Sequence, residues 1–251
     1  MDILYLGHSL VNHNIPAMVR DLAPADTTVQ EHIVNGAPLG WIWQNPDSEE
    51  FGAYSANVFD ALATGTIDVF VMTEGVPISQ TAIWWEPAKY AADFYNTAMQ
   101  YNDQTQVYMY ETWPDIRSGS GVDVPDDDLD YIPWRDRLDQ EFVVWQQVVD
   151  EVNAQRQPGQ PEMKIIPAGQ AMAKMYDAIE AGQVPGITDI SQLFIDTIHL
   201  NDLGLYFVAQ VHYATIFGEN PAGNETALAD EWGRPGEKSA AARANRSGGS
   251  A

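Results

Sequence analysis

The sequence of 251 residues contains no cysteine. This absence excludes a disulfide framework, a thiolate nucleophile and any zinc or iron-sulfur site built on cysteine sulfur. Basic residues are also scarce, because 12 lysines and arginines stand against 36 aspartates and glutamates, which gives a formal net charge of -24. Such a charge repels nucleic acid phosphates and anionic membrane surfaces, so we expect neither nucleic acid nor a membrane as a partner.

Long apolar runs are absent as well. No stretch approaches the roughly 20 apolar residues that a membrane-spanning helix requires. The first expected strand begins close to Met1, which leaves no room for a signal peptide. The sequence as written therefore predicts a cytoplasmic protein, and a periplasmic or secreted one if a leader peptide has been removed.

Short apolar runs alternate with helical patterns over most of the chain. Strand composition occurs at residues 2–6, 28–34, 67–72, 106–110 and 163–167, and helical spacing at 15–22, 53–63, 87–101, 135–153, 170–181 and 201–217. Strands that are nearly all apolar are expected when helices cover both faces of a parallel sheet. The alternation predicts an α/β fold with a doubly wound, five-stranded parallel sheet, whose ligands bind at the carboxyl ends of the strands.

The domain organisation follows from where this periodicity stops. Hydrophobic residues make up 45% of the chain, which suits one substantial core, and we expect a single domain over residues 1–217. Residues 218–251 lose the periodicity and gather small and polar residues. They predict an irregular C-terminal tail with no catalytic role.

Two segments far apart in the sequence carry candidate catalytic groups. Ser9 follows the first expected strand directly after Gly7-His8, and Asp196 and His199 stand three residues apart just before the last expected helix. A carboxylate at this spacing can orient an imidazole if the segment forms a turn, and an oriented imidazole activates a serine hydroxyl. We therefore predict that folding brings these three side chains together as a hydrolytic triad.

The same segments resemble the conserved blocks of the SGNH (GDSL-type) hydrolase superfamily of esterases and lipases. The resemblance covers about residues 2–217. Residues 7–10, Gly-His-Ser-Leu, are similar to the first block, with His8 where aspartate is commoner, and residues 35–40 are similar to the second block. Residues 196–204 are similar to the last block and contain its Asp-x-x-His pair.

The resemblance implies a flavodoxin-like, three-layer α/β/α sandwich. It also implies a role for each matching residue: Ser9 is the nucleophile, His199 takes its proton, and Asp196 holds the imidazole. The backbone N–H groups of Ser9 and Gly40 would bind the oxyanion.

The third block departs from the family pattern. The family usually presents Gly-x-Asn-Asp after the third strand, and its asparagine donates a further hydrogen bond to the oxyanion. Here residues 72–75 read Met-Thr-Glu-Gly, so no asparagine is available. An ionised Glu74 cannot donate a hydrogen bond and would repel the developing charge. Three alternatives stay open: Glu74 is protonated, it points toward the substrate or another residue, or the donor comes from elsewhere.

Aromatic residues indicate where a substrate would bind. Five tryptophans fall in loops expected at the carboxyl edge of the sheet, namely Trp41, Trp43, Trp84, Trp85 and Trp113. Together they suggest a flat apolar wall for a sugar ring or an acyl chain, although each could also serve packing alone. The residues that we predict to bind substrate are Trp41, Glu74, Glu111 and Trp113.

The acidic run at residues 123–130 has two interpretations. It lacks the spaced ligands and the central glycine of a helix-loop-helix calcium site, so we favour a solvated acidic loop over a calcium loop. We expect no metal site and no cofactor.

The function that these features favour is a serine esterase that removes small acyl groups, such as acetyl, from a carbohydrate. The expected partner is a small-molecule or oligosaccharide ester, and the sequence does not indicate an oligomeric state. Alternatives are a non-catalytic or weakly active carbohydrate-binding module on the same fold, a lipase or thioesterase, and an acyltransferase.

Overall fold

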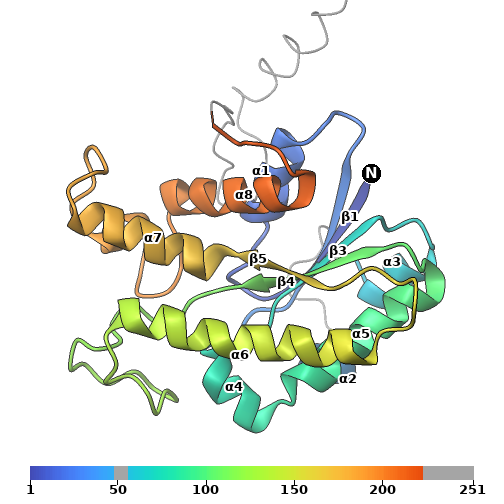
Figure 1. The fold of residues 1–251 in the computed structure, drawn as a ribbon, viewed down its shortest axis with the longest axis horizontal. Coiled ribbons are helices and arrows are strands. Elements are labelled where there is room, and N and C mark those ends of the chain that lie inside the picture. Colours follow the sequence, from blue (N-terminus) through green and yellow to red (C-terminus); the bar gives the residue numbers. More distant parts are fainter. Residues whose placement is uncertain (48–55, 223–251) are drawn as a thin grey trace, which may run out of the picture.

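The computed structural model describes residues 1–47 and 56–222. Its centre is a parallel sheet with the strand order β2-β1-β3-β4-β5 (Figure 1). The strands are β1 (Asp2–Gly7), β2 (Thr28–Ile33), β3 (Val69–Met72), β4 (Gln106–Glu111) and β5 (Lys164–Pro167). This arrangement confirms the five-stranded, doubly wound parallel sheet predicted from the sequence.

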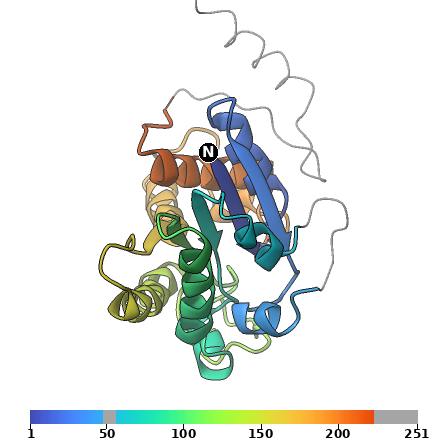
Figure 2. The ribbon, with the colours of Figure 1, turned by 90° about the vertical axis from the view of Figure 1, so that its right-hand side faces the viewer.

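Helices cover both faces of the sheet (Figures 1 and 2). The helices of one face are α1 (Asn14–Leu22), α7 (Ala168–Glu180) and α8 (Asp202–Phe217). Those of the other face include α3 (Val58–Ala63), α5 (Pro87–Tyr101) and most of α6 (Trp134–Gln155). The three layers of the predicted α/β/α sandwich are thereby confirmed.

The alternation of side chains along β1 explains why the interior of this strand consists of large, mostly apolar residues. Ile3 and Tyr5 are buried in the core under α1, α7 and α8, whereas Leu4 and Leu6 are buried in the opposite core under α3 and α5. Successive side chains of a strand point to opposite faces, and here both faces are covered. No position between Asp2 and Gly7 is therefore left for a charged residue.

Two short helices occupy segments that the sequence analysis treated as loops. They are α2 (Leu39–Gln44) and α4 (Ile78–Trp84), and each begins directly after a proline. Helices of six and seven residues hold fewer than two turns, so they are too short to show an apolar period. Residues 53–55 of the expected helix and residues 223–251 of the expected tail lie outside the described residues.

In the described ranges, no helix combines the length and the apolar character that crossing a bilayer requires.

Candidate active site

A tight turn presents Ser9 at the carboxyl edge of the sheet, directly after β1. The backbone N–H groups of Val11 and Asn12 both donate to the carbonyl oxygen of His8, at 2.9 and 3.1 Å. The turn lies close to the sheet, because a Cβ atom added to Gly7 would come within 2.7 Å of the Val11 side chain. Glycine is therefore needed where the strand leads into the turn.

His8 ties the serine turn to the loop after β3. The backbone N–H of Leu10 donates to His8 Nδ1 at 3.3 Å, which places the ring proton on Nε2, and Nε2 then donates to the carbonyl oxygen of Glu74 at 2.8 Å. Burial lowers the pKa of His8 and keeps the ring neutral, as these bonds require. The buried His8 ring therefore serves to join the turn after β1 to the loop after β3.

Strand β4 holds the same turn from the core. The hydroxyl of Tyr110 donates to the carbonyl oxygen of Leu10 at 3.1 Å, and the hydroxyl of Thr73 donates to the carbonyl oxygen of Tyr110 at 2.8 Å. All of these groups are buried. The turn is therefore held by a hydroxyl group of β4, and Thr73, the residue after β3, is bonded to the same tyrosine.

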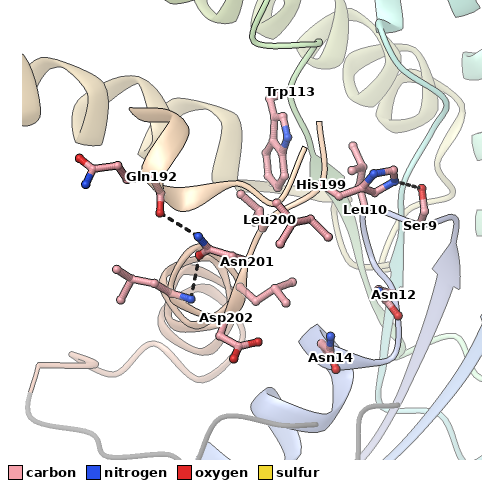
Figure 3. Close-up of a pocket in the computed structure, with 13 residues that line it drawn as sticks. Ser9, Leu10, Asn12, Asn14, Trp113, Gln192, His199, Leu200, Asn201 and Asp202 are labelled. Atoms are coloured by element: carbon pink, nitrogen blue, oxygen red, sulfur yellow. Dashed lines mark hydrogen bonds between the residues drawn. The ribbon is translucent and has the colours of Figure 1, made fainter. Parts of the chain in front are cut away.

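Asp196 forms a turn that carries His199. One carboxylate oxygen accepts from the backbone N–H groups of Ile198 and His199, at 2.8 and 2.7 Å, and the other accepts from His199 Nδ1 at 2.7 Å. A proton on Nδ1 leaves Nε2 as an acceptor. Ser9 Oγ lies 2.9 Å from this nitrogen and can donate to it (Figure 3). The structure thus brings together the three side chains that the sequence predicted as a triad.

The charge of Asp196 is stabilised although the site is partly buried. Desolvation raises the pKa of this carboxyl, but the hydrogen bonds from the backbone N–H groups of His199 and Ile198 and from the imidazole outweigh it, so the net pKa is lowered. The side chains of His199 and Asp196 are 37% and 50% exposed. An ionised acid and an accessible base therefore face the solvent together.

Neighbouring side chains hold the segment that carries His199. Trp113 Nε1 donates to the carbonyl oxygen of Ile198 at 2.9 Å. Asn201 caps the start of α8 with its side-chain oxygen, and its amide donates to the carbonyl oxygen of Gln192 at 2.8 Å (Figure 3). The base is held between a buried indole and a helix cap.

A cavity of about 710 Å³ opens beside these groups, within the size range of small-molecule sites. We call it the Ser9 cavity. Its lining includes Ser9, Asn12, Asn14, Trp113, Gln192 and His199 (Figure 3). The two asparagines and the glutamine could not be predicted as lining residues, because such residues are common in turns and caps and carry no spacing signal.

Gly40 is the second residue of α2. A Cβ atom at this position would come within 2.7 Å of the Tyr90 ring, so the close packing of α2 on α5 requires glycine. Within the described residues, the backbone N–H groups of Ser9 and Gly40 donate to no protein acceptor. Both donors are available to a ligand, and their convergence on one oxyanion stays a prediction.

Glu74 does not reach the substrate side, contrary to its prediction as a substrate-binding residue. Its side chain is completely buried, and Oε1 accepts from the backbone N–H groups of Leu39 and Gly75, at 2.9 and 2.7 Å. Burial raises the pKa of this carboxyl to about 7, and the two hydrogen bonds offset that rise only in part. The carboxyl joins the loop after β3 to the start of α2, next to Gly40.

Replacing Glu74 with glutamine is expected to change how stability depends on pH. The folded-state pKa of about 7 lies above the ordinary value of 4.5, so the unfolded chain loses this proton first as the pH rises. The wild type should lose stability between about pH 4.5 and 7 and stay at the lower level above that range. Glutamine keeps an acceptor oxygen without the charge. The free energy of unfolding of Glu74→Gln, relative to that of the wild type, should therefore rise by ~1–3 kcal/mol from pH 4 to pH 8.

Urea unfolding of both proteins at the two pH values measures this difference. Glu151→Gln on the exposed face of α6 is the matched control and should show no such gain. An equal stability difference at pH 4 and pH 8 for Glu74→Gln would contradict the burial of an ionisable carboxyl.

Glu111 is also buried, which corrects its prediction as part of the substrate wall. It is the last residue of β4, and its carboxylate accepts from the backbone N–H and the side-chain amide of Gln170 on α7, at 3.2 and 3.4 Å. Burial raises the pKa of Glu111 to about 8. The sequence analysis placed this residue in a loop, whereas the pleat of the strand turns it under a helix.

The two predicted tryptophans have different surroundings from those expected. Trp113 lines the Ser9 cavity, but it is only 1% exposed and supports the histidine segment, so it offers no free face for stacking. Trp41 is half-buried and packs against the core under α3 and α5, and it does not line the Ser9 cavity. Its prediction as a substrate-binding residue is therefore not supported by its position.

The acidic run at residues 123–130 is not uniformly solvated. Asp127 is buried and pairs with the completely buried Arg137, with 2.9 Å between Oδ1 and Nη2. The interpretation as a solvated loop is therefore wrong for this residue. Across residues 1–47 and 56–222, no three His, Asp or Glu side chains are grouped to hold a metal ion.

Comparisons with known proteins identify the fold. No protein-family model and no curated protein matches the sequence. A GDSL-like lipase from Parabacteroides merdae has a similar structure, with a TM-score of 0.54 and 12% identity over 86% of this chain and 95% of that chain.

Two carbohydrate esterases of family 3 are also similar. The Talaromyces cellulolyticus protein has a TM-score of 0.53 and 12% identity over 87% of this chain and 97% of its own. The Clostridium thermocellum protein has a TM-score of 0.51 and 12% identity over 86% of this chain and 96% of its own. Structural similarity at 12% sequence identity shows a shared fold. The chain has the fold of the SGNH (GDSL-type) hydrolase superfamily, as its sequence blocks predicted.

Proposed function

We propose that the protein is a serine esterase that removes small acyl groups, such as acetyl, from a carbohydrate. The observation that carries this proposal is the contact of 2.9 Å between Ser9 Oγ and His199 Nε2, with Asp196 bound to the other ring nitrogen. A serine hydroxyl becomes a useful nucleophile when an oriented base accepts its proton. This geometry supplies both the base and the group that orients it.

The reaction would proceed through an acyl-enzyme. Ser9 Oγ attacks the ester carbonyl while its proton moves to His199 Nε2, and Asp196 stabilises the imidazolium. The backbone N–H groups of Ser9 and Gly40 bind the oxyanion of the tetrahedral intermediate. Its collapse breaks the ester bond, and His199 gives its proton to the departing alcohol. His199 then deprotonates a water molecule that attacks the acyl-serine and releases the acid.

Glu74 supports this machinery from within the protein. Its carboxyl binds the backbone N–H of Leu39, so it holds the segment that carries Gly40 against the loop after β3. Of the three alternatives for Glu74, this contact favours the one in which the side chain points to other protein residues. We assign it a positioning role.

A carbohydrate ester suits the surroundings of the triad. The Ser9 cavity is lined by Asn12 and Asn14, whose side-chain amides can form hydrogen bonds with hydroxyl groups. The half-exposed Asp196 and His199 admit water, which favours hydrolysis over acyl transfer to another alcohol. Two proteins of similar fold are described as carbohydrate esterases, and this supports the same substrate class.

Labelling with a fluorophosphonate tests the nucleophile. Such reagents react with serine hydroxyls that a neighbouring base activates, so we expect one adduct per chain, located on Ser9 by mass spectrometry of its peptides. Protein unfolded in urea should not react, because His199 is then no longer next to Ser9. Labelling at another serine, or equal labelling of the unfolded chain, would refute the proposed triad.

Substrate class is tested with a panel of esters. Acetylated oligosaccharides and p-nitrophenyl esters of increasing chain length are compared by kcat/KM. We expect acetyl esters to be the better substrates, with activity falling as the acyl chain lengthens. A preference for long acyl chains would instead identify a lipase or thioesterase.

A further inference from the structure

A second cavity, of about 520 Å³, lies at the same edge of the sheet. We call it the Trp84 cavity. Its lining includes Gly36 from the loop after β2, Gly75 from the loop after β3, Gln80 and Trp84 from α4, and Asp126 and Asp128 from the loop before α6. Strand β1 lies between β2 and β3, so the Ser9 turn lies between the two loops that contribute to this cavity. Helices α2 and α4 lie on the same side of the molecule in Figure 1.

The cavity offers an aromatic face that the core does not use. Trp84 ends α4 and is 74% exposed, the highest value among the large apolar side chains described. Such a ring presents a flat apolar surface whose burial by a ligand is favourable. A ligand that fits here therefore has one apolar face.

Gln80 supplies the second observation. Its side chain is nine-tenths buried and lines the cavity, yet its amide forms no hydrogen bond with any protein group in the described part of the chain. The amide nitrogen and oxygen are not completely buried, so they are accessible from the cavity. An amide that can both donate and accept suits a hydroxyl group of a ligand.

Charge narrows the class of ligand further. Asp126 and Asp128 line the cavity, and none of its lining residues is a lysine or arginine. Two carboxylates repel an anionic ligand but accept hydrogen bonds from hydroxyl groups. A neutral sugar combines hydroxyl groups with an apolar ring face, which matches the aromatic surface and the polar groups together.

A buried ion network holds the two walls of the cavity in place. Arg137 Nε donates to Glu141 at 2.7 Å, and Arg137 Nη2 donates to Asp127 at 2.9 Å, between the two lining aspartates. Glu141 also accepts from the backbone N–H and the hydroxyl of Ser79, at 2.8 and 2.6 Å, beside Gln80 on α4. One arginine thereby fixes both α4 and the acidic loop, so the cavity is formed before a ligand enters.

We propose that the Trp84 cavity is a second sugar-binding subsite, which receives a neutral sugar unit of an oligosaccharide whose ester lies at Ser9. Trp84 stacks on the ring, and Gln80, Asp126 and Asp128 bind its hydroxyl groups. This inference rests on the proposed esterase function and extends it: the preferred substrate is an oligosaccharide, and a monosaccharide ester leaves the subsite empty.

The test compares Trp84→Ala with wild type on p-nitrophenyl acetate and on acetylated xylotetraose. We expect kcat/KM on the tetrasaccharide to fall about 10-fold, mainly because KM rises. This fold-loss should be at least five times the fold-loss in kcat/KM on p-nitrophenyl acetate. Ile83→Ala, an exposed neighbour on α4 that does not line the cavity, is the control and should match wild type on both esters. An equal loss on the two esters, or no loss on the tetrasaccharide, overturns the subsite.

A binding measurement separates this inference from the proposed function. Calorimetry with Ser9→Ala and unacetylated xylotetraose needs no turnover, and we expect binding that the added Trp84→Ala substitution weakens about 10-fold. If the wild type hydrolyses no ester but this binding holds, the esterase proposal fails and the subsite stands. If the protein binds tetramethylammonium in place of the sugar, the cavity is a cation site and the inference is wrong.

Discussion

Replacing Ser9 with alanine is expected to reduce kcat on p-nitrophenyl acetate by about 10⁴-fold to 10⁶-fold. The hydroxyl that lies 2.9 Å from His199 Nε2 is then absent, so no acyl-enzyme can form. The remaining rate would come from binding and oxyanion stabilisation alone. Initial rates over a range of substrate concentrations measure the effect.

The control is Ser120→Ala, which removes a hydroxyl from an exposed loop and should keep the wild-type rate. Circular dichroism of both variants checks that the fold is intact. Because members of a triad act as a unit, adding His199→Ala to Ser9→Ala should reduce kcat little further. A Ser9→Ala protein that keeps a tenth of the wild-type rate would place the nucleophile elsewhere.

Replacing Arg137 with methionine is expected to lower the free energy of unfolding by about 3–5 kcal/mol. The guanidinium is completely buried and pairs with Asp127 and Glu141, whose side chains are 1% and 3% exposed. Removing the cation leaves two carboxylates close together without a counter-charge, away from water. Urea unfolding at neutral pH measures the loss.

Arg135→Met is the matched control, since Arg135 lies on the same helix and also pairs with two aspartates. Those aspartates, Asp139 and Asp177, are more than half exposed, and surface pairs contribute about 0–1 kcal/mol. Asp127→Asn added to Arg137→Met should recover part of the lost stability, because it removes one unpaired charge. A loss no larger than that of the control would show that the buried network contributes little.

The sheet could be predicted from the sequence because every strand is covered on both faces. Val69–Met72 and Asp2–Gly7 have apolar interiors that only a central strand requires, and α5 begins and ends at the predicted residues, Pro87 and Tyr101. Helices α2 and α4 could not be predicted, because their form depends on contacts with residues remote in sequence. For Ser79 on α4, that contact is with Glu141.

The candidate catalytic groups could be selected from the sequence, but the orientation of their neighbours could not. Ser9, Asp196 and His199 carry chemistry in a recognisable order along the chain, and the topology brings them to one edge. Glu111 was predicted to follow the strand and to face the substrate, but it is the last residue of β4 and is buried under α7, because the sequence does not show whether such a residue faces solvent or a helix. Trp84 ends α4, whose residue Ser79 is bound by Glu141 of a buried salt-bridge network that no short motif reveals.

The separation of 190 residues between Ser9 and His199 has a consequence for biogenesis. His199, and α8 after it, leave the ribosome only after 190 further residues have been added beyond Ser9. A nascent chain that stops between these two residues therefore lacks the proposed base. In refolding experiments, recovery of the proposed ester cleavage would time the docking of α8 onto α1, the step that brings the His199 segment to the Ser9 turn.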